Sequence, residues 1–128
     1  MKTSELTGAA LDWAVAKCEG AYAPSVDADI DGTKRINYGG MYPDWSTDWA
    51  QGGPIIEREQ LSVEPRYNGD EGLVCWVAYG HNLKYDERGE YIEGSDHLQE
   101  GPTPLIAAMR CYVASKLGDT IDIPEELK

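Results

Sequence analysis

The chain has 128 residues, 41% of them hydrophobic, and a formal net charge of −12 at pH 7. This length suits one domain with its own hydrophobic core. The large negative charge argues against binding to nucleic acid or to an anionic membrane surface, and no apolar run approaches the roughly 20 residues that cross a bilayer. Phenylalanine is absent, so tryptophan and tyrosine must supply the aromatic packing.

The cysteines and the N-terminus predict the compartment. Cys18, Cys75 and Cys111 are widely spaced, odd in number and placed in apolar segments. We therefore expect buried, reduced thiols in a cytoplasm, rather than disulfides or a metal site. Met1-Lys2 is followed by polar residues, which does not match a secretory signal peptide.

A first helix is predicted over Leu6–Gly20. Thr7 is the expected N-cap, with Leu6 packing across it, and Gly20 is a natural terminator. Trp13 lies off the centre of the apolar stripe and should be half-buried. The stripe consists of Leu11, Ala14, Val15 and Cys18.

The next segment contains an acidic turn. The pattern Asp27-x-Asp29-x-Asp31-Gly32 imitates the first half of an EF-hand calcium loop, but its twelfth position is Tyr38 instead of a bidentate glutamate. We expect a solvated acidic turn without specific calcium binding. A short strand is predicted over Lys34–Tyr38.

The central stretch, Tyr42–Glu59, combines two tryptophans with a Gly-Gly-Pro break. Ser46, Thr47 and Asp48 can start a turn or helix. Pro54 suits the first position of a short helix over Ile55–Gln60, with free amides ahead of it. Two interpretations remain open, a structural corner plugged by both indoles or the wall of a ligand site.

Two adjacent strands are predicted after the central stretch. Leu61–Arg66 alternates in polarity, and Pro65 indicates either the end of this strand or an edge position in the sheet. Asn68-Gly69 indicates a turn. Leu73–Tyr79 is apolar without alternation, which predicts a central strand buried on both faces.

The polar segment Gly80–Glu100 is predicted to be an excursion with a small hairpin. Lys84-Tyr85 and Tyr91-Ile92 can pair around Arg88-Gly89. The only histidines, His81 and His97, lie beside no carboxylate at a catalytic or metal-binding spacing, so surface loop positions are expected.

A second long helix is predicted over Thr103–Leu117. Thr103 caps it, Pro104 takes its first position, and Gly118 ends it. Arg110 is one of only two charges in this helix, and it is a candidate for an internal salt bridge, which is favoured, or for an anionic ligand. Ile121 and Ile123 then suggest a terminal strand.

Together these elements predict an α+β fold in one domain spanning residues 1–128. Two main helices, one from each end of the chain, should pack on one face of a small, mostly antiparallel sheet. The apolar strand and the broad apolar face of the last helix exceed what a two-layer monomer covers, which predicts a homo-oligomer.

Three blocks of the chain resemble the NinX-type family of lambdoid phages and prophages. They are Leu6–Ala16, Trp45–Glu59 and Gly101–Tyr112, in the order that the family has them. The resemblance implies a phage or prophage accessory protein in the cytoplasm of a bacterial host. It implies no catalytic residues.

Three classes of function remain open, and no motif for a cofactor, a metal or a catalytic group is present. The first is a binding protein for a small planar or nucleotide-type ligand, which would serve counter-defence by sequestering a host signal. The second is an acidic inhibitor of a host protein, by DNA mimicry or direct interaction. The third is an enzyme of unrecognised class, which a strongly shifted His, Asp or Glu pKa in a cleft would favour. The predicted ligand-binding residues are Trp45, Asp48, Trp49, Gln51, Gly52, Gly53 and Arg110.

Overall fold

The computed structural model describes residues 1–20, 24–81, 84–92 and 95–128. In this part of the chain the helices and strands are η1 (Thr3–Glu5), α1 (Gly8–Cys18), β1 (Ser25–Ala28), β2 (Lys34–Asn37), α2 (Trp49–Glu59), β3 (Ser62–Asn68), β4 (Gly72–Tyr79), β5 (Gln99–Gly101), α3 (Pro104–Leu117) and η2 (Glu125–Leu127). Two antiparallel sheets, ordered β1-β2 and β3-β4-β5, accompany the helices. The predicted α+β class is therefore confirmed.

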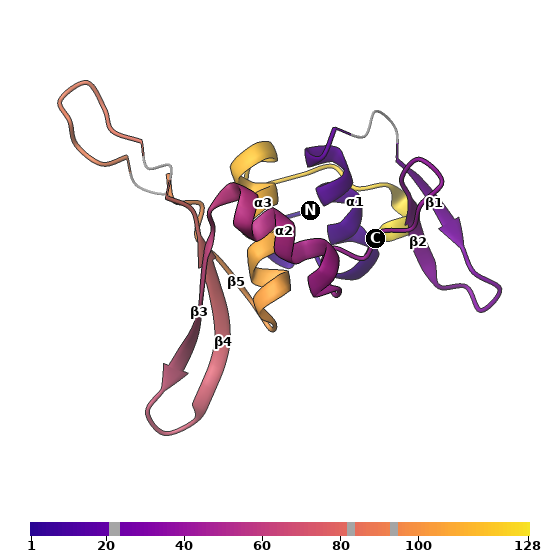
Figure 1. Ribbon diagram of the computed structural model, residues 1–128, viewed down its shortest axis with the longest axis horizontal. Coiled ribbons are helices and arrows are strands. Elements are labelled where there is room, and N and C mark those ends of the chain that lie inside the picture. Colours follow the sequence, from indigo (N-terminus) through magenta and orange to yellow (C-terminus); the bar gives the residue numbers. More distant parts are fainter. Residues whose placement is uncertain (21–23, 82–83, 93–94) are drawn as a thin grey trace.

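Helix α3 is the centre of the fold (Figure 1). One side of it packs on all three strands of the β3-β4-β5 sheet, while α1 and α2 cover other sides. Because it is surrounded, its buried residues extend around the helix: Leu105, Ala107, Ala108, Met109, Arg110, Cys111, Tyr112, Val113 and Ala114. Thr103 caps it as predicted, with its side chain accepting a hydrogen bond from the amide of Ile106 at 3.1 Å.

Helix α1 occupies a different layer from the predicted one. It packs on α3 and on β2, so that it lies between α3 and the β1-β2 hairpin rather than on the three-stranded sheet. Thr7 has the extended backbone of an N-cap, but its side chain makes no capping hydrogen bond, contrary to the prediction. Trp13 is half-buried as expected, with the ammonium group of Lys17 5.7 Å from the centre of its ring.

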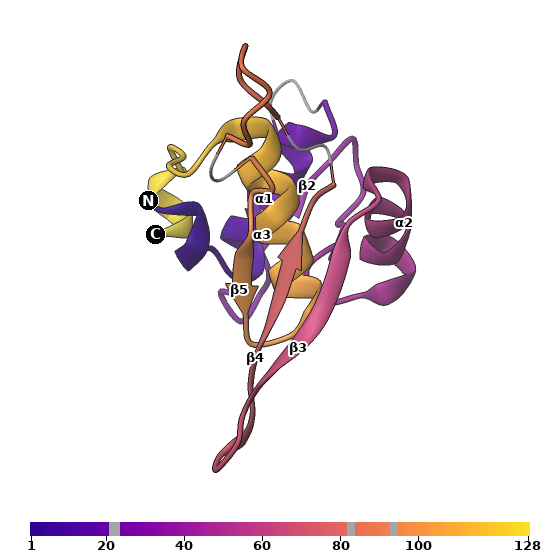
Figure 2. The ribbon, with the colours of Figure 1, turned by 90° about the vertical axis from the view of Figure 1, so that its left-hand side faces the viewer.

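Strand β4 is central in its sheet, as predicted, but only its second half is buried on both faces. Val77 and Ala78 are buried, whereas the side chains of Leu73 and Val74 are 51% and 53% exposed. The reason is that the second half of β3 and the first half of β4 extend beyond α3 as a two-stranded arm (Figure 2). Pro65 lies in β3, which is an edge strand, so its missing N–H costs no hydrogen bond to a further strand.

Two hairpins project at opposite ends of the molecule. The β1-β2 hairpin contains the predicted strand and a second one, β1, that the sequence analysis missed. The predicted pairing around Arg88-Gly89 is also present, with a bridge between Tyr85 and Tyr91 and a 2.8 Å hydrogen bond from the amide of Ile92 to the carbonyl oxygen of Lys84.

The C-terminal segment pairs with the N-terminus rather than forming the predicted strand. The amino group of Met1 donates to the carbonyl oxygen of Ile121 at 3.0 Å, and the amide of Ile121 donates to the carbonyl oxygen of Met1 at 2.9 Å. Ile121 and Ile123 are buried, so this contact closes the core and brings the termini together (Figure 2).

Candidate functional site

The central stretch forms α2, which starts earlier than predicted. The helix begins at Trp49, capped by Asp48, whose side chain accepts a hydrogen bond from the amide of Ala50 at 2.9 Å. Pro54 therefore lies inside the helix instead of at its first position. The amide of Gly52 donates to the carbonyl oxygen of Asp48 at 2.8 Å, so it is not the free donor that the sequence suggested.

Asp48 and Gln51 hold each other in this corner. Nε2 of Gln51 donates to Oδ2 of Asp48 at 3.1 Å, and Oε1 of Gln51 accepts a hydrogen bond from the amide of Asp44 at 2.7 Å. Both polar side chains thus have local partners that fix the start of α2. A ligand at either side chain would compete with these bonds.

The two tryptophans of the stretch lie in different environments. Trp45 is 9% exposed and packs edge-on against Tyr38, with ring centres 5.6 Å apart. Trp49 is 56% exposed and lines a shallow pocket of about 210 Å³. The other residues of that pocket are Ser46, Thr47, Thr103, Leu105 and Ile106, so it contains neither Trp45 nor Arg110.

Arg110 is buried, and its hydrogen bonds connect α3 with the segment at Leu6 and with β5. Its Nε donates to the carbonyl oxygen of Leu6 at 2.8 Å, and one of its terminal nitrogens donates to the carbonyl oxygen of Glu100 at 2.8 Å. The favoured salt bridge is not formed with any described residue. Burial lowers the pKa of Arg110, although the group stays charged at neutral pH.

Arg110 also lines a pocket of about 570 Å³. The pocket opens between β4, the β5 strand and η1, and its volume is in the range typical of small-ligand sites. Its lining includes both apolar and polar residues. The other lining residues are Ser4, Val74, Cys75, Leu98, Gln99, Glu100, Gly101 and Pro102.

A β-bulge shapes one wall of this pocket. The pairing of β3 with β4 shifts between Arg66 and Tyr67, which face Cys75 and Leu73, so Val74 has no partner residue on β3. On its other side β4 pairs with β5 only from Trp76 onward. Bulges redirect side chains beside functional sites, and here the bulged residue, Val74, lines the pocket.

A second feature, which the sequence analysis missed, is the buried carboxylate of Asp12 on α1. It is 6% exposed, and Oδ1 accepts a hydrogen bond from the amide of Ser46 at 2.9 Å. Burial raises the pKa of Asp12 to about 6, and the nearby charge of Asp44 adds to the rise. The hydroxyl group of Ser46 lies close enough to lower this pKa, but not in the geometry of a hydrogen bond.

The sequence did contain a signal for Asp12. Helix α1 is apolar on nearly every side, which is typical of a helix buried all around. A single carboxylate in the middle of such a helix must be buried with it. Carboxyl groups with a raised pKa in a cleft occur at functional sites more often than elsewhere, and this is the feature that was expected to favour an enzyme.

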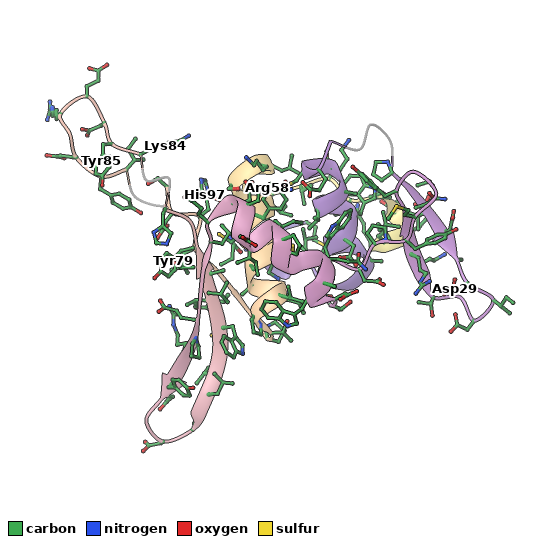
Figure 3. The ribbon with its side chains drawn as sticks, in the orientation of Figure 1. Asp29, Arg58, Tyr79, Lys84, Tyr85 and His97 are labelled. Atoms are coloured by element: carbon green, nitrogen blue, oxygen red, sulfur yellow. The ribbon has the colours of Figure 1, made fainter. Side chains whose placement is uncertain are left out.

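Arg58, which is labelled in Figure 3, lies at the centre of an ionic network that joins the end of α1 with α2 and α3. Its terminal nitrogens bind both carboxylate oxygens of Glu19, at 3.1 and 2.8 Å, and its Nε binds Glu59 at 3.0 Å. The hydroxyl group of Tyr112 donates to Glu19 at 2.8 Å. These bonds to Glu19 and Glu59 raise the pKa of Arg58. Every member is engaged within the protein, so the network is structural.

Both histidines line one small pocket of about 190 Å³, together with Lys84, Asp96 and Cys111. Nε2 of His81 makes a short contact with the hydroxyl group of Ser62. Figure 3 shows Lys84 and Tyr85 on the projecting hairpin and His97 closer to the helices. His81 is exposed and His97 is partly so, and the surface positions predicted for them are largely right.

The acidic turn is organised by hydrogen bonds within its own hairpin. Oδ1 of Asp31 accepts from the amide of Thr33 at 3.0 Å, Asp29 pairs with Arg35 at 3.7 Å, and Asp27 accepts from the hydroxyl group of Tyr42 at 2.8 Å. The three carboxylates therefore point to different partners. Among the residues that the structure describes, no group of three His, Cys, Asp or Glu side chains is placed to hold a metal ion.

The fold and these pockets define a small α+β protein with a buried arginine, Arg110, in the lining of one pocket. No helix of the described residues is long and apolar enough to span a bilayer. The chain belongs to the phage family described as "Bacteriophage P22, NinX", whose model matches residues 2–116. It is therefore a small phage accessory protein. No curated protein matches the chain.

Proposed function

We propose that this protein binds a small anionic ligand of the nucleotide type, and that Arg110 is the cation that anchors it. The observation that carries the proposal is the charge of Arg110. This residue is buried, lines the pocket of about 570 Å³ and is bound in the described structure only by carbonyl oxygens. A buried charge without a counterion is costly. An anion in the pocket would supply the missing charge.

The walls of the pocket support a ligand that is partly apolar. Val74, Leu98 and Pro102 offer apolar surface, while Gln99 and Ser4 offer hydrogen-bonding groups. This mixture suits a phosphate or carboxylate attached to a flat heteroaromatic group. For a phage protein, sequestering such a molecule would deprive a host defence system of its signal.

The position of Trp49 changes the site that the sequence suggested. Trp49 and Arg110 line different pockets, so the geometry does not support a single small ligand that contacts both residues. The proposal therefore rests on Arg110 and the pocket beside it. Trp49 is the candidate for a separate planar group, and Trp45, Asp48, Gln51, Gly52 and Gly53 support the corner that presents it.

The test places a competing charge beside Arg110 without touching its structural bonds. Ser4 is exposed and lines the pocket. In Ser4→Glu a carboxylate can occupy the anion position, while Ser4→Gln adds similar bulk without charge. Binding of AMP, with adenosine as the uncharged probe, is measured by calorimetry or by NMR titration of amide signals.

We expect AMP to bind the wild type and Ser4→Gln alike, and to bind Ser4→Glu at least about tenfold more weakly, a loss of about 1.4 kcal/mol. Adenosine should bind weakly to all three. If Ser4→Glu and Ser4→Gln bind AMP equally tightly, the anion does not bind beside Arg110. Native mass spectrometry of protein purified from infected cells would identify the natural ligand, and a protein that carries no anion and binds no nucleotide would overturn the proposal.

A further inference from the structure

We propose that a second cavity, between α1, β2 and the loop before α2, binds a short ω-amino acid, with its ammonium group at Asp12 and its carboxylate at the start of α1. The cavity measures about 200 Å³. It is lined by Gly8, Ala9, Asp12, Thr33, Lys34, Arg35, Ile36, Pro43, Asp44 and Thr47. It shares no residue with the Arg110 pocket, so the two proposals stand or fall separately.

At the acidic end of the cavity, no described cation forms a salt bridge with Asp12 or Asp44. Asp12 is only 6% exposed. In the described structure only Oδ1 of its carboxylate has a hydrogen-bond partner, the amide of Ser46. Asp44 lies close enough for its charge to disfavour the charge of Asp12. Two neighbouring carboxylates in a partly buried site repel one another. An ammonium group between them would offset both the repulsion and the cost of burial.

The other end of the cavity is positive. Because Thr7 makes no side-chain cap, the amides at the start of α1 are available where Gly8 and Ala9 line the cavity. Amides at a helix N-terminus, together with the helix dipole, favour an anion. Lys34 adds a full charge, and it lies on the same face of β2 as the buried Ile36, because strand residues two apart share a face.

Arg35 is the weaker candidate for this role. Its guanidinium group lies 3.7 Å from Asp29 and 5.9 Å from the ring centre of Tyr42, so it is engaged in the hairpin. No described carboxylate forms a salt bridge with Lys34. Lys34 is therefore the cation that a carboxylate in this cavity would meet.

The spacing of the two ends selects the length of the ligand. Gly8 and Asp12 are four residues apart on one helix face, which is about 6 Å along the axis, and a helical side chain points back toward the N-terminus. A ligand lying along the helix surface can place one charged group at these amides and the other at the carboxylate if its two charged groups are about 4–6 Å apart. An amino acid with about two to four carbons between its charged groups meets this requirement, whereas a single ion does not.

The test compares 4-aminobutyrate with butyrate and butylammonium, each of which carries only one of its charges. Titrations are followed by the amide NMR signals of Ala9, Asp12 and Thr47. We expect 4-aminobutyrate to shift these signals and to bind at least about tenfold more tightly than either control. If butylammonium binds as tightly as 4-aminobutyrate, the cavity binds only the cation and the proposed carboxylate end is wrong. If 4-aminobutyrate at tens of millimolar shifts none of these signals, the whole proposal is wrong.

Three variants test the assignment of the ends. Asp12→Asn keeps an oxygen for the amide of Ser46 but removes the charge, and Lys34→Met removes the charge at the other end. Each should weaken binding of 4-aminobutyrate at least about fivefold. Lys17→Met, which removes a cation on α1 outside the cavity, should leave binding unchanged. If Lys34→Met binds like Lys17→Met, the proposal is wrong, whether or not Asp12→Asn folds.

Discussion

Asp12 on α1 and Ser46 in the central stretch are joined by a buried hydrogen bond of 2.9 Å, from the amide of Ser46 to Oδ1 of Asp12. The bond connects the first helix to the corner that starts α2, across 34 residues of sequence. It also places an ionisable group in the core. Its energetic effect therefore depends on pH.

The first prediction concerns this dependence. The folded state raises the pKa of Asp12 to about 6 from its ordinary value of 3.8. Between these values the folded state binds more protons than the unfolded state, so the contribution of Asp12 to stability is lost as the pH rises. We expect the wild type to lose on the order of 2 kcal/mol relative to Asp12→Asn between pH 4 and pH 7.5.

Urea unfolding of both proteins across this range measures the difference. The subtraction matters because other carboxylates act in the opposite direction. The pKa of Asp31, for example, is lowered by its hydrogen bond from the amide of Thr33. A constant difference between wild type and Asp12→Asn from pH 4 to pH 7.5 would show that the Asp12 carboxyl has an ordinary pKa.

The second prediction concerns the Gly52-Gly53 pair, whose members have different roles. A Cβ atom at Gly52 would collide with the carbonyl oxygen of Trp45 and the side chain of Leu105, whereas at Gly53 the nearest atom is in the ring of Trp49, 3.8 Å away. We expect Gly52→Ala to destabilise the protein by about 1–3 kcal/mol through overpacking. Gly53→Ala should be neutral or stabilising by up to about 1 kcal/mol, since alanine favours a helix.

Thermal and urea unfolding of the two variants measure this contrast, and each serves as the control of the other. Similar effects from both substitutions would contradict the close packing of α2 against Trp45 and Leu105 at Gly52. The glycine pair suggested a break in the sequence analysis because glycine and proline usually interrupt helices. Here the closeness of packing, which a single sequence does not show, required a glycine inside one.

The elements with a clear local pattern were predicted well. Helix α3, with its cap at Thr103 and its first residue Pro104, follows from sequence because these signals are local. Strand β5 was missed because Gln99–Gly101 is three residues long and polar. It exists through its pairing with Trp76–Ala78 and through the hydrogen bond that its Glu100 carbonyl accepts from Arg110. Such long-range contacts leave no periodicity to detect.

The same reasoning applies to the site and to self-association. Arg110 was singled out correctly as unusual, but its partners are carbonyl oxygens, and only the fold reveals them. The apolar face of the last helix, part of the case for a homo-oligomer, is covered within the chain by the sheet and by α1 and α2. The exposed Tyr67, Leu73 and Val74 of the β3-β4 arm remain, and the homo-oligomer stays a prediction.

The third prediction separates an integrated ion pair from a peripheral one. Arg58 binds Glu19 through two nitrogens, also contacts Glu59, and lies beside the hydroxyl group of Tyr112 at 3.1 Å. Arg66 makes a single salt bridge to Glu100 on the exposed face of the sheet. We expect Arg58→Met to destabilise by about 1–2 kcal/mol, since Glu19 is left with less compensation. Arg66→Met should cost no more than about 0.5 kcal/mol.

Chemical denaturation at low and high salt tests this pair. The effect of Arg58→Met should persist at high salt, because the side chain of Glu19 is only 19% exposed. Equal costs for the two substitutions would show that the network at Arg58 contributes no more than an isolated surface pair.

The last prediction uses the three cysteines as reporters of the structure. All three thiols were expected to be buried. Cys111 is buried, but Cys18 and Cys75 are only partly buried, and Cys75 lines the open Arg110 pocket. Burial raises the pKa of both Cys18 and Cys111 to about 12, so that few of these thiols are ionised at neutral pH. Because the thiolate is the reacting species, a thiol reagent should modify Cys75 first. We expect its rate in the native protein to exceed the other two by at least about tenfold, with Cys75→Ser removing the fast phase. Peptide mass spectrometry at successive times assigns each rate.

If Cys18 or Cys111 reacts as fast as Cys75 under native conditions, then the core around α3 opens more readily than its packing indicates. If AMP slows the reaction of Cys75 in the wild type and in Ser4→Gln but not in Ser4→Glu, the reporter places the anion beside Arg110 by a route independent of calorimetry.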